Sequence, residues 1–431
     1  MKIHYWHFQT LLPACILLLG CGQSSTDKTG DVPVIEIVQN LEKYQAVPLS
    51  QFVSELEYIP LETNKDCLLP ESGSDLIVTS THIFVRGNRF CFAFGRDGRF
   101  LGNIGSVGQG PGEYSYSTSF SIDEKNQSLY LHASHALLEY SWDGVFRRSI
   151  PLPEEEMYGG IPSDVFFVRD NLFIGHYRNR MGDVCHNFIL FDQSSDVVKL
   201  FDNYEQFNRR AEIGSPTNSC MRPYRIAEHV YVKEISNDTL FYLNEQNELV
   251  PHFVFDLGKH TITKEKRENE GRVIGKYSEN EEIRAPMEYW PIIETQNHLF
   301  FSFRALNLSG QYSFPKRIDM PFTSDMHGLV GIYDMSNQTT QLLETNPVSR
   351  ILGLINDLDG GLSFWPKYYT SDNELVDIWR AEHMKEYLTE AYFAAHEIKD
   401  AKAHQKLKEL LENMTEYDNP VIVIAKLKPD L

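Results

Sequence analysis

The sequence has little cysteine, no excess of positive charge and no apolar run long enough for a stable membrane span. Its 431 residues contain 6 cysteines, and 40 lysines and arginines stand against 60 aspartates and glutamates, a net charge of -20. Phosphate backbones and anionic lipid headgroups attract clustered basic residues, so this charge argues against a nucleic-acid partner and against docking on such lipids. The 42% apolar fraction still supplies a sizeable core, enough for one large β domain or two ordinary domains.

Familiar catalytic and metal-binding motifs are missing as well. None of the 15 histidines lies in a His-Glu-x-x-His pattern, no Gly-x-Ser-x-Gly elbow is present, and no two cysteines have Cys-x-x-Cys spacing. The glycine-rich stretch 105–110 lacks the Lys-Ser/Thr ending of a phosphate-binding loop, and no predicted helix follows it. The sequence therefore gives no local support for a zinc centre, a nucleophilic triad or a nucleotide cradle, and we predict no catalytic residue.

Residues 1–20 are typical of an export signal. Lys2 is their only lysine or arginine, and the apolar run Leu11–Leu19 is too short to anchor the chain as a membrane span. The run ends in Leu-Leu-Gly-Cys21, which resembles a bacterial lipobox. The resemblance implies cleavage before Cys21, lipid on its thiol and a polar tether over residues 21–33. We therefore expect a lipid anchor in the outer membrane, with the protein in the cell envelope facing the periplasm or the exterior.

Four cysteines remain after the signal and the lipobox are set aside: Cys67, Cys91, Cys185 and Cys220. Four cysteines allow three pairings, and the sequence does not choose among them. We expect mostly buried free thiols, because Cys91 lies inside the apolar run Phe90–Phe94.

Short β-rich segments recur in six clusters along the chain. The first cluster covers about 75–104, with strands predicted near 76–79, 82–86, 90–94 and 99–104. Turn dipeptides at Gly87-Asn88 and Asp97-Gly98 separate the last three strands. The other clusters cover about 118–150, 164–202, 224–257 and 288–344, and a sixth opens at Ile351–Leu354 and finishes at Val421–Lys426. Since no four-stranded unit buries both faces alone, stacking in a ring is favoured, and we predict an all-β, six-bladed β-propeller.

Three segments interrupt these clusters, and we expect a segment before the first cluster to close the ring of blades. Thr261–Ile283 is a charged insertion, and Asn307–Asp325 is a loop-like one. Ser371–Met414 has helical periodicity and opens on a Ser-x-x-Glu capping pattern. This helical insertion is either a partner-docking arm or lid, or a helical hairpin packed on the propeller rim, which we favour. We also expect Val34–Val38 or Leu56–Leu61 to pair with the C-terminal strand.

The segment Ile-Gly-x-x-Gly-Gln-Gly-Pro-Gly-Glu-Tyr114 resembles the signature of six-bladed β-propeller lipoproteins common in Bacteroidetes. Further segments agree with that family's later blades, in the family's order: Asn237–Tyr242 with Pro251 and Phe255–Gly258, Asn356–Gly361 with Phe364–Pro366, and Asn419–Ile424. The resemblance implies one propeller over residues 34–431. The family has no established reaction, so it implies no catalytic residues.

Aromatic and arginine side chains beside polar turns are the candidates for ligand binding. Aromatic faces stack on sugar rings, and arginine binds carboxylates. We predict a non-catalytic protein, without a cofactor, whose propeller face binds a glycan, a peptide or an envelope protein. The candidate residues are Tyr116, Tyr177, Arg178, Arg225, Trp290 and Trp365.

A calcium-dependent hydrolase or lyase is the alternative. Asn356 and Asp357 offer hard oxygen ligands, and Asp75 and Asp164 open their blades at comparable points, so the four residues are candidates for one site in the central channel. The loop that begins at Asn356 lacks the glutamate that a calcium loop carries at its twelfth position. Ordinary turn chemistry also explains these residues, because Asp and Asn side chains bond their own backbone.

Overall fold

Alternating apolar residues and tight turns build the first blade. Its strands β4 (Asp75–Val78), β5 (His82–Gly87), β6 (Phe90–Gly95) and β7 (Phe100–Asn103) form one antiparallel sheet in chain order. Each observed strand overlaps a predicted one, and both predicted turns lie where expected.

The computed structural model describes residues 32–70, 75–154, 160–179, 181–208, 224–226, 229–234, 237–261, 263–269, 287–305, 327–346 and 351–429.

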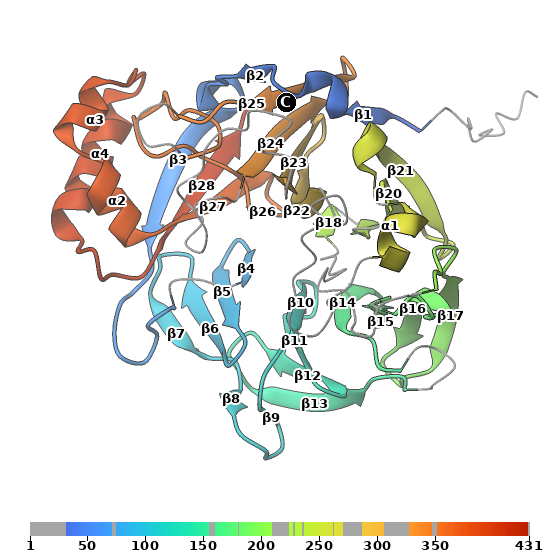
Figure 1. Cartoon of the computed structure of the whole chain (residues 1–431). Helices are drawn as coiled ribbons and strands as arrows, with labels where there is room; N and C mark the ends of the chain where they lie inside the picture. Colours follow the sequence, from blue (N-terminus) through green and yellow to red (C-terminus); the bar gives the residue numbers. More distant parts are fainter. Residues whose placement is uncertain are drawn as a thin grey trace, which may run out of the picture. The chain divides into compact units, whose positions relative to one another are not determined.

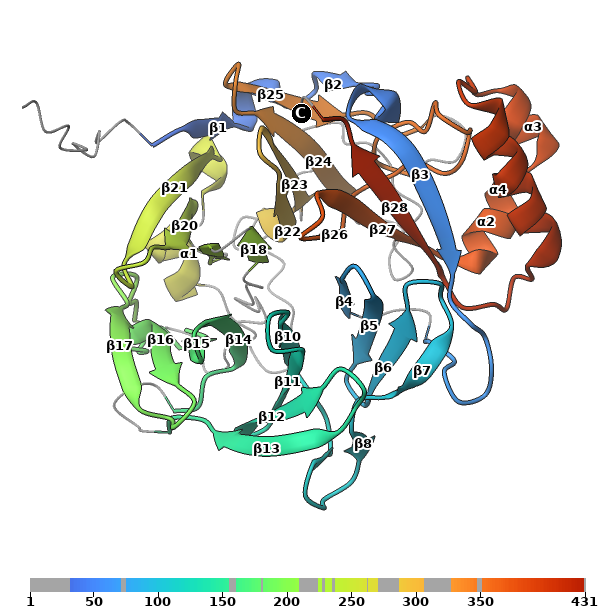
Figure 2. The ribbon, with the colours of Figure 1, turned by 180° about the vertical axis from the view of Figure 1, so that it is seen from behind.

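The same four-stranded plan recurs around a ring of six blades (Figures 1 and 2). The second blade has β10 (Ser119–Asp123), β11 (Ser128–Ala133), β12 (Ala136–Ser141) and β13 (Phe146–Pro151). The third has β14 (Asp164–Arg169), β15 (Leu172–His176), β16 (His186–Asp192) and β17 (Val197–Asp202). The fourth has β18 (Tyr224–Ile226), β19 (His229–Lys233), β20 (Thr239–Leu243) and β21 (Leu249–Asp256). The fifth has β22 (Met287–Glu294), β23 (His298–Ala305), β24 (His327–Asp334) and β25 (Thr339–Leu343). The six-bladed β-propeller is thus confirmed.

The sixth blade joins the two ends of the propeller. Its strands lie in the order β26 (Tyr368–Tyr369), β27 (Glu374–Trp379), β28 (Val421–Leu427) and β3 (Val53–Pro60), and β3 pairs with β28. Of the two segments expected to close the ring, the second therefore does so.

The first of those two segments instead pairs with the fourth blade, and the chain that follows it pairs with the fifth. β1 (Val34–Glu36) pairs in parallel with β21, and β2 (Tyr44–Gln45) pairs in parallel with β25. Two 3-10 helices, η1 (Val38–Asn40) and η2 (Leu49–Gln51), complete this lead-in. The lead-in therefore covers the outer strand edges of the fourth and fifth blades before it enters the sixth.

Two sequence predictions for the sixth blade are wrong. Ile351–Leu354 forms only isolated bridges and does not open the blade, whose inner strand is β26. The helical insertion does not begin at Ser371, because 374–379 is the strand β27. The Ser-x-x-Glu pattern is a turn in which the Thr370 hydroxyl accepts from the backbone N–H groups of Asp372 and Glu374.

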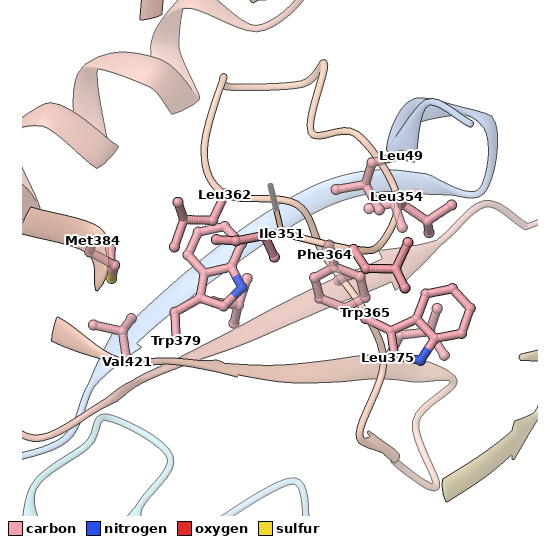
Figure 3. Packing of buried hydrophobic residues seen from close by; sticks show 14 of the residues in the cluster. Leu49, Ile351, Leu354, Leu362, Phe364, Trp365, Leu375, Trp379, Met384 and Val421 are labelled. Carbon is pink, nitrogen blue, oxygen red and sulfur yellow. The ribbon is translucent and has the colours of Figure 1, made fainter. Parts of the chain in front are cut away.

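The helices of the insertion begin after β27 and pack on the sixth blade. They are α2 (Ala381–Tyr387), α3 (Glu390–Ala394) and α4 (Ala401–Asn413), and Asp400 caps α4 by accepting from two backbone N–H groups. Figure 3 shows Trp379 of β27 and Met384 of α2 in one apolar cluster with Val421 of β28. Leu407 and Leu411 of α4 belong to the same cluster. The favoured interpretation, a helical hairpin packed on the propeller, is confirmed for the described residues.

A repeated joint connects neighbouring blades. The turn before the outer strand of one blade abuts the end of the preceding outer strand. Gly144 has φ +85°, and a Cβ there would lie 2.5 Å from the carbonyl oxygen of Asn103. Gly98 meets the carbonyl of Pro60 in the same way, while Ser195 donates its hydroxyl to the carbonyl of Pro151 at 2.5 Å. Glycine tolerates both this backbone conformation and so close an approach. At the third joint Ser195 adopts the same conformation, with φ +71°, and its hydroxyl turns the close approach into a hydrogen bond.

Other predicted segments are described only in part. The 3-10 helix η4 (Gly258–His260) lies just before the charged insertion, and α1 (Lys264–Asn269) lies within it. The loop-like insertion Asn307–Asp325 lies outside the described residues. Cys67 and Cys91 are buried free thiols, Cys185 is an exposed one, and Cys220 is not among the described residues. In the described part of the chain, no helix has the length and apolar character that a membrane crossing requires.

Candidate functional site

In each blade, the innermost strand begins and the second strand ends at the same end of the propeller axis. We call this end of the propeller the mouth. The register places Asp75 opposite Arg86, Ser119 opposite His132, and Asp164 opposite His176. Because the first two strands of a blade are antiparallel, the start of one lies beside the end of the other. Basic side chains occupy the last or the next-to-last position of the second strands in the first four blades, namely Arg86, His132, His176 and Lys233.

The first blade contributes a buried ion pair to the mouth. Arg86 pairs with Asp75 and donates from Nη1 to the carbonyl of Ser117 at 2.7 Å. Burial lowers the pKa of Arg86, and the charge of Asp164 on the third blade opposes that shift, so the two blades interact electrostatically. The Arg86 side chain is only 3% exposed, and such a cation is tolerated because its partners are in place.

His132 of the second blade is neutral. Its Nδ1 lies 2.9 Å from the Thr118 hydroxyl and its Nε2 lies 3.3 Å from the carbonyl of Ser134, so Nε2 carries the proton. Burial lowers the pKa of His132 to about 4, and the cations Arg178 and Arg86 lower it further against the opposing charge of Asp164. The charges of arginines from the first and third blades therefore both act on His132.

A buried histidine connects the third and fourth blades. His176 Nε2 lies 3.1 Å from Glu234 Oε1, and Nδ1 lies 3.9 Å from Asp164 Oδ2. Asn187 Nδ2 donates to the other oxygen of Glu234 at 2.6 Å. Burial alone would lower the pKa of His176, but the two carboxylates outweigh it and raise the pKa to about 9. His176 is therefore a cation near neutral pH.

Lys233, which ends β19, stabilises the turn that carries Glu234. Its ammonium donates to the carbonyls of Glu234, at 2.6 Å, and of Asn237. Burial lowers the pKa of Lys233 to about 7, against the charges of Asp238 and Glu234. The Asn237-Asp238 segment that resembles the propeller family is thus the turn that positions Glu234 at the mouth.

The mouth combines charges that largely balance one another. Arg86 pairs with Asp75, Arg178 donates to both oxygens of Asp164 at 3.2 and 3.4 Å, and His176 pairs with Glu234. Burial raises the pKa of Asp164, but His176 and Arg178 outweigh it and hold that pKa below its usual range. Ionised, engaged carboxylates are suited to binding polar groups rather than to abstracting a proton.

The four candidate calcium ligands are not brought together. Asp75 and Asp164 lie at the mouth, but the Asp357 carboxylate accepts from Ser50 and from Lys399, the latter at 2.6 Å. Asn356 Oδ1 accepts from the backbone N–H groups of Leu358 and Asp359, which is the turn chemistry weighed from the sequence. Among the described residues, no three acidic, histidine or cysteine side chains are grouped to hold a metal ion. The described residues therefore do not support one shared site for these four ligands, and the calcium-dependent activity stays a prediction.

The loop 356–361 holds the helical insertion instead, and we call it the dock. The backbone N–H groups of Lys399 and Asp400 donate to the carbonyls of Asp357 and Leu358 at 3.0 and 2.7 Å. His404 of α4 donates from Nδ1 to the carbonyl of Asp359 at 2.7 Å. The fully buried carboxylate of Asp359 accepts from Tyr58 of β3 at 2.7 Å. The dock thus joins three separate segments of the chain.

The predicted ligand-binding residues differ in exposure. Arg178 lies at the mouth, and Tyr116 is 48% exposed and adjoins Ser117. Arg225 donates to the carbonyls of Phe167 and Val168 and so joins the third blade to the fourth. The aromatic rings of Tyr177 and Trp365 (Figure 3) are buried in apolar clusters and are not available to a ligand. The side chain of Trp290 is not among those described.

The glycine-rich signature loop is occupied by its own carboxylate. Glu113 Oε2 accepts from the backbone N–H of Gly110 at 2.8 Å, and a Cβ at Gly108 would collide with that same oxygen. The loop carries the short parallel strands β8 (Ser106–Val107) and β9 (Glu113–Tyr114). The glycines therefore make room for Glu113 in the loop that leads from the first blade to the second.

Sequence reasoning missed Arg86, His132, His176 and Glu234 as members of one site. The signal of the three basic residues is a basic side chain at or next to the end of the second strand in successive blades, which is visible only once the blades are aligned with one another. Sequence reasoning also missed that Asn419, in the closing segment, hydrogen-bonds the backbone of residues 62–69. Asn419 donates from Nδ2 to the carbonyls of Glu62 and Cys67, and accepts from the backbone N–H of Leu69.

The fold and the mouth define a six-bladed β-propeller with a charge-balanced polar site at one end of its channel. The chain belongs to the family described as a domain of unknown function, DUF4934, whose model matches residues 32–426. The resemblance to propellers of Bacteroidetes is thereby confirmed at the level of family and fold.

Two solved structures with similar folds come from Bacteroides. A Bacteroides fragilis protein inferred to be exported is 17% identical, with a TM-score of 0.63 over 92% of this chain and 99% of its own. A DUF4221 member from Bacteroides vulgatus is 10% identical, with a TM-score of 0.44 over 67% of this chain and 84% of its own. At 17% identity, the likeness to the Bacteroides fragilis protein shows the fold alone. No curated protein matches the chain.

Proposed function

We propose that this chain is an exported, lipid-anchored propeller that binds a peptide or an envelope protein at the mouth and catalyses no reaction. One observation carries the proposal: ionisable side chains of four blades meet at the mouth, and their carboxylates are paired with cations. The site offers both donors and acceptors, which suits the mixed polarity of a peptide.

Exposure of the aromatic residues favours a peptide over a glycan. A glycan site needs exposed aromatic faces, and Tyr177 and Trp365 are buried. Tyr116 is exposed, and a single ring also packs against a peptide side chain. The glycan is therefore the outcome against which the peptide is tested.

Peptide and glycan arrays probed with residues 22–431 test the proposal directly. This span contains the whole unit Pro33–Leu431, which has its own core. We expect peptide binding that weakens at least about tenfold in Arg178→Gln, since a charge-assisted hydrogen bond contributes about 1.5–3 kcal/mol. Binding to glycans alone, or turnover of a substrate that single mouth substitutions abolish, would contradict the proposal.

Attachment through Cys21 is a separate part of the proposal. It is supported by the lipobox resemblance and by the fold likeness to a Bacteroides protein inferred to be exported. In cells that process lipoproteins, we expect Cys21→Ser to lose acyl labelling and to leave the membrane fraction. Cys15→Ser lies inside the predicted signal and is the matched control, for which labelling should persist.

A further inference from the structure

Arg178 differs from the other cations of the mouth in its exposure. Its side chain is 23% exposed, whereas those of Arg86 and His176 are 3% and 2% exposed. Asp164 holds it from one side, since only Nη2 of the guanidinium donates to that carboxylate. Within the described ranges, Nη1 of Arg178 donates to no residue. Arg178 is thus a fixed cation with donors left over for a ligand.

Two guanidinium groups at the mouth carry buried donors without a partner. Nε of Arg178 and Nε of Arg86 are buried and have no hydrogen-bond partner among the described residues. Buried polar groups in folded proteins are nearly always hydrogen-bonded, so each such exception calls for an acceptor. These two arginines belong to the third and first blades, and both act on His132 between them. Oδ1 of Asn187 is a buried acceptor that likewise has no partner among these residues, so the mouth lacks acceptors for the two arginines and a donor for Asn187. The partly exposed guanidinium of Arg178 is the place where a ligand can supply an acceptor.

A carboxylate fits this requirement better than a doubly charged phosphate. Arginine matches planar oxyanions, and it binds them through more than one N–H. Asp75, Asp164 and Glu234 already neutralise most of the positive charge at the mouth. The whole chain carries a net charge of -20, which further disfavours a dianion.

We infer that Arg178 is the residue that receives a carboxylate of the ligand, from a peptide with an acidic side chain or a free C-terminus. This inference rests on the proposed function and specifies its ligand. The specificity of the mouth is thus for one negative charge.

The experiment uses a synthetic peptide array in which every sequence is printed with a free C-terminal carboxylate and as the amide, and each Asp or Glu is paired with Asn or Gln. The soluble chain 22–431 is the probe, and fluorescence anisotropy gives Kd for the best pairs. We expect the acid forms to bind about tenfold or more tightly than their neutral partners, the range of a charge-assisted bond. Arg178→Gln should remove that preference, and Arg178→Lys should retain part of it.

Arg99→Gln is the matched control, because Arg99 is exposed in the turn between β6 and β7, away from the mouth. It should keep the full preference, and circular dichroism should show that every variant is folded. Peptides bound equally well as acid and amide, with no change in Arg178→Gln, would overturn this inference and leave the proposed function intact. An array without any bound peptide would instead overturn the peptide ligand of the proposed function, on which this inference rests.

Discussion

The mouth and the dock contain similar acidic residues, but these residues do different things. At the mouth, Asp164 and Glu234 are paired with cations, and the His176–Glu234 contact joins two blades. At the dock, Asp359 accepts from the Tyr58 hydroxyl and from the backbone N–H of Gly361. The mouth therefore concentrates charge, whereas the dock mostly satisfies backbone and hydroxyl groups.

The difference is visible in the protonation of the two regions. Burial raises the pKa of Asp359, and the hydrogen bonds it accepts only partly offset this. Burial also acts on Asp164, yet the cations His176 and Arg178 outweigh it and lower the pKa. Fixed cations keep Asp164 ionised, whereas Asp359 has none in hydrogen-bond contact, and this is why we propose the mouth rather than the Asp359 carboxylate of the dock as the ligand site.

The largest expected effect is on the core beneath the dock. Trp379→Ala removes a buried ring that packs between β27 and the helices, so we expect the free energy of unfolding to fall by about 3–5 kcal/mol. Chemical denaturation measures it. Tyr417→Ala is the control, because that ring is 79% exposed and its loss should change stability by less than about 0.5 kcal/mol.

Next comes the buried cation of the mouth. His176→Gln leaves Asp164 and Glu234 with less positive charge, and we expect a loss of about 3 kcal/mol at neutral pH. The folded pKa is raised from 6.5 to about 9, so His176 stabilises the fold fully below pH 6.5 and loses this effect as pH rises through 9.

Thermal melts across that pH window check the sign. The difference in melting temperature between the wild type and His176→Gln should shrink as pH rises from 6.5 to 9. The exposed His135, changed to Gln, should melt like the wild type throughout. A difference that grew with pH would show that His176 is buried in its neutral form.

A smaller effect is expected inside the dock. Tyr58→Phe removes the hydroxyl that donates to Asp359 at 2.7 Å, but Asn356 and Gly361 still donate to that carboxylate. We expect destabilisation of about 1–2 kcal/mol, measured by denaturant melts, with Tyr417→Phe as the neutral control. A loss of unfolding free energy as large as that of His176→Gln would contradict the proposed difference between the dock and the mouth.

The smallest effect belongs to the partly exposed ion pair of the dock. Lys399 is 44% exposed, and Asp357 keeps its hydrogen bonds from Ser50 when the ammonium is removed. Lys399→Met should therefore cost less than about 1 kcal/mol in the same melts. A cost of several kcal/mol would mean that charge, rather than backbone hydrogen bonding and packing, holds the insertion.

Much of the fold was predictable because its signals are local. Turn dipeptides such as Asp97-Gly98 and Asp143-Gly144 mark hairpins, and the same glycines make the inter-blade joints. The strand β27 was misread because Leu375, Ile378 and Trp379 fit a helical period. A strand buried on both faces has no alternation to distinguish it from a helix.

The site was less predictable because its contacts join residues far apart in the chain. His176 and Glu234 are separated by 58 positions, and no motif beside either residue in the sequence predicts their contact. Burial of Tyr177 and Trp365 depends on how blades stack, which composition does not reveal. Arg178 was predicted because an arginine beside a polar turn is a local signal.

The most direct test compares one variant from each region against the same acidic peptide. Fluorescence anisotropy gives Kd for the wild type, Arg178→Gln and Lys399→Met, after melts show that both variants are folded. The account predicts that Arg178→Gln weakens binding about tenfold or more, while Lys399→Met binds like the wild type. Unchanged binding in Arg178→Gln together with lost binding in Lys399→Met would contradict it and place the ligand at the dock.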